Sequence, residues 1–187
     1  SNRYWSKKTF SPSSLIFYLG IEKKIKKLTH HNLFFDEDLE QYTKEIYDYK
    51  IWPKKPLFYV CCPSKTDKQV APIGKENIFI LMPIPIGIND SKEIREKYFN
   101  IIMSRLEKYC RQNIKGHIEY KKTYCIKEFK KDYNSYKGNA YGLANTLSQT
   151  ANLKPKIRNK TIKNLFYTGQ LTVPGPGVPP SLISGKI

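Results

Sequence analysis

The sequence predicts an α/β fold, and three observations support this class. Apolar runs of strand length alternate with segments whose apolar residues recur every three or four positions, as expected for buried strands and for one face of a helix. Hydrophobic residues make up 40% of the 187 and aromatic residues 13%, which allows a packed core and excludes wholesale disorder. The mass of 21.9 kDa suits one domain or the tail of a larger protein.

Two continuous apolar runs, 57–62 and 78–82, predict central strands because both of their faces are apolar. The segment 63–77 between them contains proline and glycine and is long enough for an ordered loop that joins antiparallel partners. Further strands are expected at 15–19, where Gly20 ends the run, at 33–35 and at 118–124.

The most regular helical pattern covers 91–112. Asp90 is expected to cap this helix, with Glu93 three positions further on. Its apolar face comprises Ile94, Tyr98, Ile101, Ile102 and Leu106. Ion pairs at i, i+4 spacing are expected on the other side, between Glu93 and Lys97 and between Glu107 and Arg111.

A second helix is expected from about 36 to 49. Four acidic residues stand where it would begin: Asp36, Glu37, Asp38 and Glu40. Acids in a first helical turn suit the helix dipole, and we prefer this explanation to a general acid/base pair or a cation site because calcium-loop spacing is absent. A short helix is expected at 126–133, followed by irregular structure beyond Tyr136.

The chain is strongly basic, with 33 Lys and Arg against 16 Asp and Glu and a formal net charge of +17. Only five of the basic residues are Arg. Proteins that recognise DNA bases favour Arg because of its planar guanidinium, so sequence-specific DNA binding is disfavoured. The lysines are scattered, which favours a generic basic surface over a membrane-facing or nucleic-acid-binding one. No nucleic-acid partner is expected.

Neither a transmembrane helix nor a secretory signal is expected. No stretch approaches 18 uninterrupted apolar residues, and no apolar segment follows the first five residues. The four cysteines show no C-x-x-C spacing. Reduced thiols are therefore expected rather than a disulfide framework.

Common catalytic and nucleotide-binding motifs are absent from the sequence, including G-x-S-x-G, H-E-x-x-H, the P-loop and G-x-G-x-x-G. His30 and His31 are neighbours on an expected strand, so they should point to opposite faces and should not bind one ion together. A metal site built from them with Cys61 and Cys62 is therefore disfavoured. No metal site is predicted. A nucleophilic cysteine would need a histidine to activate it. His117 is a candidate for that role only because the sequence identifies no better one.

The segment 164–185 combines an expected strand at 165–168, ending at Gly169, with a Pro/Gly-rich loop and a helix that starts at Pro180-Ser181. Glycines let a backbone approach a ligand closely, and a helix N-terminus presents free N–H groups. A ligand anchor and a plain connector both fit this pattern, and the residues alone do not decide between them.

The segments 139–151, 164–169 and 174–179 together closely resemble the C-terminal end of bacterial phytoene desaturases, in the carotenoid desaturase branch of the amine-oxidase-like flavoproteins. Upstream segments resemble the middle region of the same family: 13–20, His30-His31, and 59–67 with Ala71-Pro72. The resemblance covers nearly the whole chain.

The resemblance implies the C-terminal part of a two-domain FAD-binding flavoprotein. Residues 1–131 would form part of a substrate-binding domain with a mixed sheet, and 132–187 the C-terminal portion of the FAD-binding domain, including its closing strand and helix. Family members carry a G-x-G-x-x-G fingerprint near their N-terminus that this sequence lacks. A fragment that is inactive alone is therefore implied.

The implied cofactor is FAD, held non-covalently. Gly169 and Gln170 match positions that approach the ribityl-diphosphate of the cofactor. Five residues match the loop under the isoalloxazine ring: Gly175, Pro176, Gly177, Val178 and Pro179. The helix start behind Gly177 is expected to offer free N–H groups near Val178 and Ser181 to the charge of the reduced flavin.

The implied reaction is FAD-dependent desaturation of a carotenoid precursor, from phytoene towards lycopene. The flavin accepts the hydride and the protein orients the polyene in an apolar tunnel, so catalytic residues stay unassigned. A carotenoid isomerase or a later-step desaturase is the alternative within the family. A basic module that binds membrane or nucleic acid is the alternative of another class.

A lipid-soluble carotenoid substrate implies a cytoplasmic enzyme attached peripherally to the inner face of the cell membrane. The charge of +17 would favour anionic lipid. The oligomeric state stays open.

Overall fold

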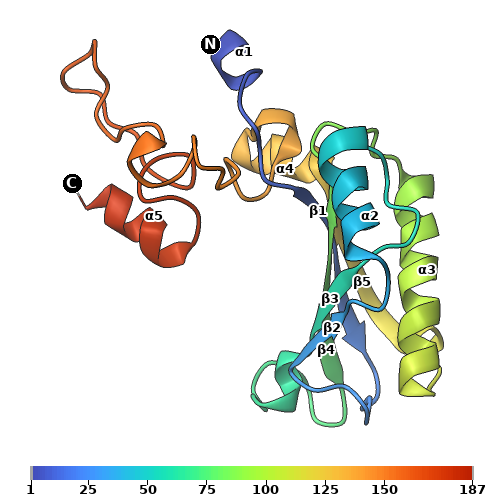
Figure 1. The fold of residues 1–187 in the computed structure, drawn as a ribbon. Helices are drawn as coiled ribbons and strands as arrows, with labels where there is room; N and C mark the ends of the chain where they lie inside the picture. Colours follow the sequence, from blue (N-terminus) through green and yellow to red (C-terminus); the bar gives the residue numbers. More distant parts are fainter. Residues whose placement is uncertain (1, 187) are drawn as a thin grey trace.

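One five-stranded antiparallel sheet, in the order β2-β3-β4-β1-β5, organises the protein, with helices against one of its faces (Figure 1). The computed structural model describes residues 2–186. The strands are β1 Ser13–Ile21, β2 His31–Phe34, β3 Phe58–Cys61, β4 Glu76–Ile84 and β5 Ile118–Tyr124. The helices are α1 Asn2–Trp5, α2 Leu39–Lys44, α3 Lys92–Cys110, α4 Ile126–Tyr133 and α5 Val178–Gly185. The α/β class is confirmed. The sheet that the described residues form is purely antiparallel, rather than the mixed sheet that the resemblance implies for the whole substrate-binding domain.

The central position of β3 and β4 is confirmed, and the loop between them joins antiparallel partners as expected. The expectation that Gly20 ends the first strand is wrong, because β1 continues through it to Ile21. The register between β1 and β5 shifts between Gly20 and Ile21. A Cβ on Gly20 would lie 3.3 Å from Tyr120 Cβ, so glycine here permits the close approach of β5 rather than a turn.

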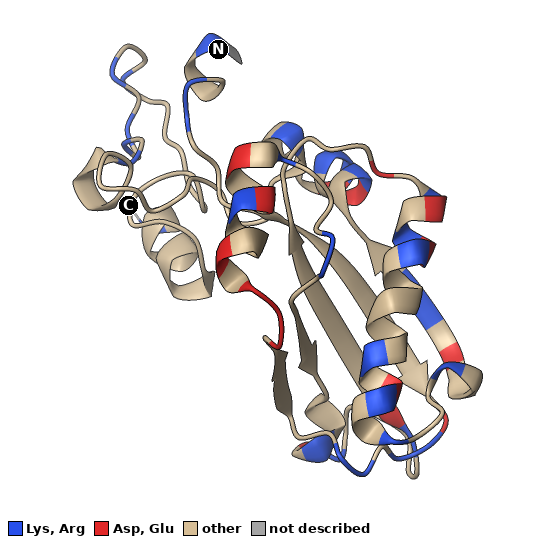
Figure 2. Ribbon diagram, turned by 45° about the vertical axis from the view of Figure 1, so that its right-hand side comes forward, with Lys and Arg blue, Asp and Glu red and all other residues tan. Residues whose placement is uncertain are grey.

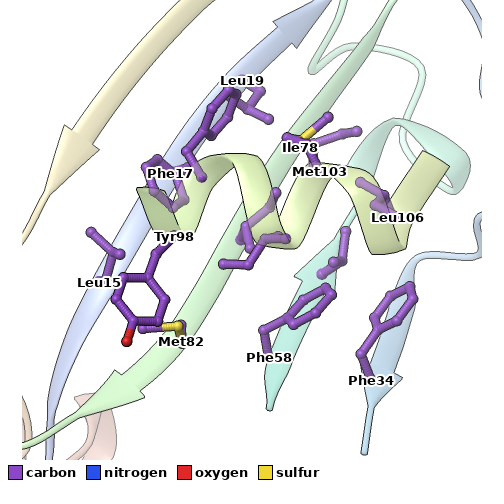
Figure 3. Packing of buried hydrophobic residues seen from close by; sticks show 14 of the residues in the cluster. Leu15, Phe17, Leu19, Phe34, Phe58, Ile78, Met82, Tyr98, Met103 and Leu106 are labelled. Carbon is purple, nitrogen blue, oxygen red and sulfur yellow. The ribbon is translucent and has the colours of Figure 1, made fainter. Parts of the chain in front are cut away.

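The hydrophobic core lies between the sheet and α3 (Figure 3). The alternate residues of each strand that point towards α3 are buried, since successive side chains on a strand face opposite sides. Phe17 on β1 packs on Phe99 of α3 with ring centroids 5.1 Å apart. The buried residues of α3 are Tyr98, Phe99, Ile102, Met103, Leu106 and Cys110, with Ile94 and Ile101 half-buried beside them. The predicted apolar face is therefore confirmed.

The start of α3 differs from the prediction. Ser91 caps the helix and accepts the N–H of Ile94 at 3.3 Å. Asp90 instead binds Arg95 through two contacts of 2.6 Å. Sequence patterns cannot distinguish these neighbours, because an acid and a hydroxyl are both good caps.

The two predicted surface ion pairs of α3 are also wrong: within residues 2–186, neither Glu93 with Lys97 nor Glu107 with Arg111 forms one. Glu107 Oε1 instead accepts the backbone N–H groups of Ile114 and Lys115, at 2.6 and 2.7 Å. The Glu107 carboxylate bonds these free N–H groups rather than Arg111, because an exposed ion pair contributes little to stability.

The acidic cluster acts as a helix start, as predicted. Asp38 caps α2 by accepting the N–H groups of Glu40 and Gln41, at 2.9 and 3.0 Å. The helix begins at Leu39 rather than near 36, and it continues as a π-helical turn, Glu45–Tyr49. The remaining acids form ion pairs with bases: Asp36 with Arg105, Glu37 with Lys55 and Glu40 with Lys44.

The part that we call the C-terminal stretch, 139–186, lies beside the N-terminal segment and away from the core of the sheet (Figure 1). Phe10 forms an isolated bridge with Leu143, and the Gln149 side chain bonds both backbone groups of Thr9, at 3.0 and 2.7 Å. The residues before β1 therefore pack with the C-terminal stretch.

The strand expected at 165–168 is wrong. Phe166 makes only an isolated bridge with Arg158, and its side chain is half-exposed. The short apolar run has no neighbouring strand to bury it in the described part of the chain, so it stays a loop.

Lys and Arg are scattered over the helices and loops and alternate with acids along α3 (Figure 2). Along the described residues the basic side chains are therefore interspersed with acidic ones, as the scattered lysines of the sequence led us to expect. Among the same residues, every helix is too short or too polar to cross a membrane.

Candidate functional site

The segment 169–177, which we call the glycine loop, leads directly into α5. Gly169, Gly175 and Gly177 have φ angles of 98°, 132° and 113°, which L side chains rarely adopt. The helix expected from Pro180 is confirmed and starts at Val178, with Gly177 as its N-cap. Glycine is thus required by the backbone at three positions of this loop.

Hydrogen bonds to Ser184 close the unit formed by the glycine loop and α5. The buried Ser184 Oγ accepts the N–H of Gly169 at 2.9 Å and lies 2.8 Å from Thr168 Oγ1. Gly169 therefore lies against the last turn of α5, while Gly177 caps its first turn. Because α5 has eight residues, its first and last turns, and so the two glycines beside them, are separated by about 12 Å along the helix. The predicted site residues do not meet at one point; they lie along a line that suits an elongated ligand.

The N-terminus of α5 offers fewer free donors than the sequence suggested. Pro179 and Pro180 have no N–H, and the N–H of Ser181 donates to the carbonyl of Gly177 at 3.0 Å. The expectation of a free donor therefore holds for Val178 and is wrong for Ser181. Among the described residues, the N–H groups of Gly175, Gly177 and Val178 have no hydrogen-bond partner. These three donors are close in sequence and could bind one anionic group.

Lys154 places a positive group beside these donors. Its side chain is buried, and among the described residues Nζ has no hydrogen-bond partner. A Cβ on Gly175 would lie 3.1 Å from Lys154 Cε. Burial lowers the pKa of the Lys154 amine. A buried charged amine without a partner is costly unless an anion compensates it, so Lys154 is a candidate anion-binding group at this place.

Sequence reasoning missed Lys154. The chain holds 28 lysines, and nothing in the local pattern separates this one from the solvated majority. Only its burial next to Gly175 does so.

The two halves of the C-terminal motif come together in space. A Cβ on Gly142 would lie 3.0 Å from the carbonyl oxygen of Gln170, and the N–H of Val173 donates to the carbonyl of Pro155 at 3.2 Å. Gly142, with a φ of 78°, thus allows the segment 139–151 to support the glycine loop. Gln170 is placed by this contact at the start of the loop.

The residues of the glycine loop fit FAD. The cofactor carries anionic diphosphate oxygens and a flavin ring that gains negative charge on reduction. Free N–H groups, a buried amine and a backbone without Cβ atoms supply the matching donors and the space for close approach. The residues that would hold it are Gly169, Gln170, Gly175, Pro176, Gly177, Val178, Pro179 and Lys154.

The face of the sheet opposite α3, which we call the open sheet face, carries a row of aromatic side chains. Cross-strand partners share a face, so Tyr18 pairs with Phe79 at 5.4 Å between ring centroids, and Tyr59 lies 6.4 Å from Phe79. Leu33 and Tyr120 continue the row and are exposed. This surface is apolar and accessible, which suits a long apolar ligand.

The remaining sequence hypotheses concern histidine and cysteine. His117 Nδ1 lies 2.6 Å from Glu22 Oε1 and so is engaged by a carboxylate rather than by a thiol. The expectation that His30 and His31 point to opposite faces is wrong. His30 lies in the bend before β2, and both rings come near Cys61. Cys62 points the other way, with Sγ 3.5 Å from Glu76 Oε2.

Comparison with known proteins identifies the relatives of this chain. Over 183 residues, 98% of the chain, it is 40% identical to carotenoid 3,4-desaturase of Haloarcula japonica. The chain is a relative of the carotenoid desaturases. It is 28% identical over 185 residues to the zeta-carotene-forming phytoene desaturase of Myxococcus xanthus, and 30% identical over 182 residues to 4,4'-diaponeurosporene oxygenase of Staphylococcus aureus.

The chain spans 37%, 35% and 36% of the length of these three carotenoid desaturase relatives. No family model matches the sequence. The resemblance noted above is thus confirmed at the level of the carotenoid desaturases, which are oxidoreductases of carotenoid biosynthesis.

Proposed function

We propose that this chain is the C-terminal part of an FAD-dependent carotenoid desaturase. The observation that carries the proposal is the 40% identity to a carotenoid 3,4-desaturase over 98% of the chain. The glycine loop with its unpaired donors supports the same assignment, because it provides an anion-binding backbone in the segment that resembles the flavin-binding end of the family. The relative's name favours a later-step desaturase that acts on an already conjugated carotenoid. Phytoene desaturation towards lycopene is the second candidate.

FAD would supply the hydride acceptor. The chain's own contribution would be electrostatic and steric. The N–H of Val178 and the amine of Lys154 would stabilise negative charge on the cofactor, and Gly175 and Gly177 would let it lie against the backbone. At the far end of α5, Gly169 would leave room for the extended part of the cofactor, since a Cβ built there meets nothing within 4 Å.

The carotenoid would bind at the open sheet face. The rings of Tyr18, Tyr59 and Phe79 form an apolar surface on three adjacent strands, and a polyene needs orientation more than polar contacts. In this proposal residues 1–131 belong mainly to the substrate-binding domain and 132–187 to the FAD-binding domain. The packing of Phe10 and Thr9 on the C-terminal stretch adds the first residues of the chain to the FAD-binding side.

The function is tested by expressing the full-length protein in cells that make different carotenoids and identifying the extracted pigments. New double bonds at the ends of an already conjugated carotenoid are the expected result. Conversion of phytoene would favour the second candidate. An unchanged desaturation state in every strain, with the protein present and flavin-loaded, would refute the desaturase assignment.

The cofactor site is tested by Gly177→Val in the full-length protein. We expect a lower FAD content or a lower flavin reduction potential, because the side chain would keep the ring from the backbone. Gly74→Val is the matched control: Gly74 also has a positive φ, of 81°, but its Cβ would point into open space in the loop before β4. Unchanged FAD content and potential in Gly177→Val would show that the loop is only a connector.

The isolated 187 residues are expected not to retain FAD, because the G-x-G-x-x-G fingerprint that supplies most diphosphate contacts is absent from them. Purified chain with stoichiometric flavin absorbance would contradict this. In contrast, the full-length protein should be isolated yellow.

We further propose that the enzyme works in the cytoplasm on the inner face of the cell membrane, from which a lipid-soluble carotenoid must enter. The net charge of +17 would favour anionic lipid. The full-length protein should sediment with anionic vesicles at low salt and be released at high salt. Equal binding to neutral vesicles without salt dependence would contradict the electrostatic part of the proposal.

A further inference from the structure

His30, His31 and Cys61 form a cluster that the proposed desaturase function does not use. One ring nitrogen of each histidine and Cys61 Sγ all lie within 4.8 Å of one another. The sheet creates this proximity, because His31 on β2 is the register partner of Cys61 on β3 and cross-strand partners share a face. His30 joins them from the bend before β2. Its carbonyl accepts the N–H of Cys62 at 2.8 Å, and its ring lies 4.2 Å from that of His31 between centroids.

Both rings are held by hydroxyl groups through Nδ1. His30 Nδ1 lies 2.6 Å from Thr66 Oγ1, and His31 Nδ1 lies 2.5 Å from Tyr59 Oη. In the part of the chain that the structure describes, Nε2 of neither ring has a hydrogen-bond partner. Histidines that bind metal commonly have one nitrogen oriented by an oxygen and the other bound to the ion.

Cys61 differs from the other three cysteines. Cys62, Cys110 and Cys125 are buried, and burial raises the pKa of each of these thiols. Cys61 is only half-buried, so its sulfur can be reached by a metal ion from solvent. Cys61 also lies beside the Tyr59 hydroxyl that holds the ring of His31.

We propose that His30, His31 and Cys61 bind a transition-metal ion of borderline softness, of the Zn²⁺ type, with the fourth position open to solvent. Two imidazoles and one thiolate are a donor set that Zn²⁺ accepts. Around a tetrahedral ion with bonds of about 2.0–2.3 Å, ligand atoms lie about 3.3–3.8 Å apart. Donor atoms at the 4.8 Å limit would have to move inward by about 1 Å, and the exposed ring of His31 and the half-buried Cys61 leave room for this.

The nearby charge does not prevent cation binding. Lys65, which follows β3, pairs with Glu76 Oε1 at 2.7 Å and donates to the carbonyl of Ile25 at 2.6 Å. On binding through Nε2, each ring would carry its proton on Nδ1 and donate it to Thr66 or Tyr59, and the thiol proton would pass to solvent. The ion would link the edge strand β2 to β3 at one end of the open sheet face.

The test is a titration of the purified, reduced chain with Zn²⁺ and with Co²⁺ after treatment with a chelator. We expect one equivalent of metal, a rise in melting temperature with Zn²⁺, and thiolate-to-metal charge-transfer absorption with Co²⁺. Cys61→Ser should abolish that absorption. His30→Ala and His31→Ala should each weaken binding at least tenfold. Tyr59→Phe, which removes the support of His31, should weaken it roughly 10- to 100-fold.

Two matched controls should bind as the wild type does. His117→Ala removes the only histidine outside the cluster, and Cys110→Ser removes a cysteine at the end of α3. Far-UV circular dichroism and metal-free melting verify the fold of each variant, and Cys61→Ala serves if Cys61→Ser melts early. The proposal is wrong if the wild-type chain shows no saturable one-equivalent binding, or if the cluster variants bind as tightly as the two controls.

Discussion

The sheet unit, residues 13–133, and the C-terminal stretch, 139–186, are stabilised by different interactions. In the sheet unit the buried side chains are mostly apolar, and they pack between β1–β4 and α3. In the C-terminal stretch five of the buried side chains are polar: Asn139, Gln149, Lys154, Thr172 and Ser184. Its large apolar side chains are mostly exposed, as with Leu147, Leu153, Phe166 and Leu182.

The two parts are therefore kept in their folded conformations by different interactions. The sheet unit buries its own apolar surface and can be stable for that reason. The C-terminal stretch depends on hydrogen bonds such as those of Ser184 and Gln149, and on close backbone contacts at Gly142. Exposed apolar side chains on such a segment mark a surface that binds something else. This agrees with the proposal that further protein and a cofactor cover it.

The largest expected effect comes from removing one aromatic ring from each part. Phe17→Ala should lower the free energy of unfolding by about 3–5 kcal/mol, because Phe17 is fully buried against Phe99. Phe166→Ala, in the C-terminal stretch, should change it by about 0.5 kcal/mol or less, since that ring is half-exposed. Urea denaturation followed by circular dichroism measures both. Equal losses would contradict the division into two differently stabilised parts.

An effect of comparable size is expected from the ion pair that joins α3 to α4 in the sheet unit. Arg95 bonds the buried Asp90 and also Glu128, with Nη2 2.7 Å from Glu128 Oε2. Arg95→Leu should cost about 3–5 kcal/mol, because it leaves the buried Asp90 carboxylate without its cationic partner. Lys44→Met, which breaks only an exposed pair with Glu40, is the matched control and should cost at most about 0.5 kcal/mol. Comparable losses in the two variants would refute the role given to burial.

A smaller effect is the acid sensitivity that Asp90 gives the sheet unit. Burial alone would raise the pKa of its carboxyl, but hydrogen bonds from Arg95 and from the N–H of Lys127 lower it below the ordinary value. Because the folded pKa lies below the unfolded one, this stabilisation is present above about pH 4 and is lost as the pH falls further.

The acid sensitivity is checked by measuring the free energy of unfolding at several pH values in the wild type and in Asp90→Asn. The variant should show a shallower loss of stability in acid. Some acid sensitivity should remain, because the pKa of Glu76 is also lowered, by Lys65 and Ser64 against the effect of burial. An unchanged slope would show that Asp90 does not contribute.

The smallest expected effect has the opposite sign and lies in the C-terminal stretch. Lys154→Met should raise the stability of the isolated chain by up to about 1 kcal/mol, because it removes a buried amine without a partner and keeps the apolar stem. The exposed neighbour Lys156→Met is the control and should leave stability unchanged. In the full-length protein Lys154→Met should instead weaken FAD retention. A loss of stability in the isolated chain would mean that the amine is not a ligand group.

The regular elements could be predicted because their signal is local. Continuous apolar runs located β3 and β4, and the spacing of apolar residues located α3, because burial imposes such patterns on a segment. The weaker patterns at β5 and α4 also correspond to elements, although no residue of β5 is buried. Element ends were less predictable. The extension of β1 through Gly20 depends on β5 lying against that glycine, and the choice of Ser91 over Asp90 as a cap depends on Arg95 engaging the acid.

The sequence by itself determined the α/β class, the antiparallel pairing of β3 with β4, and, through its motifs, the relation to carotenoid desaturases. Only the tertiary structure decided which polar groups are left without partners. Lys154 is one lysine among 28 until folding buries it beside Gly175, and His30, His31 and Cys61 are unrelated positions until the β2–β3 register brings them together. Burial and cross-strand register join residues far apart in the chain, so a local pattern cannot encode them.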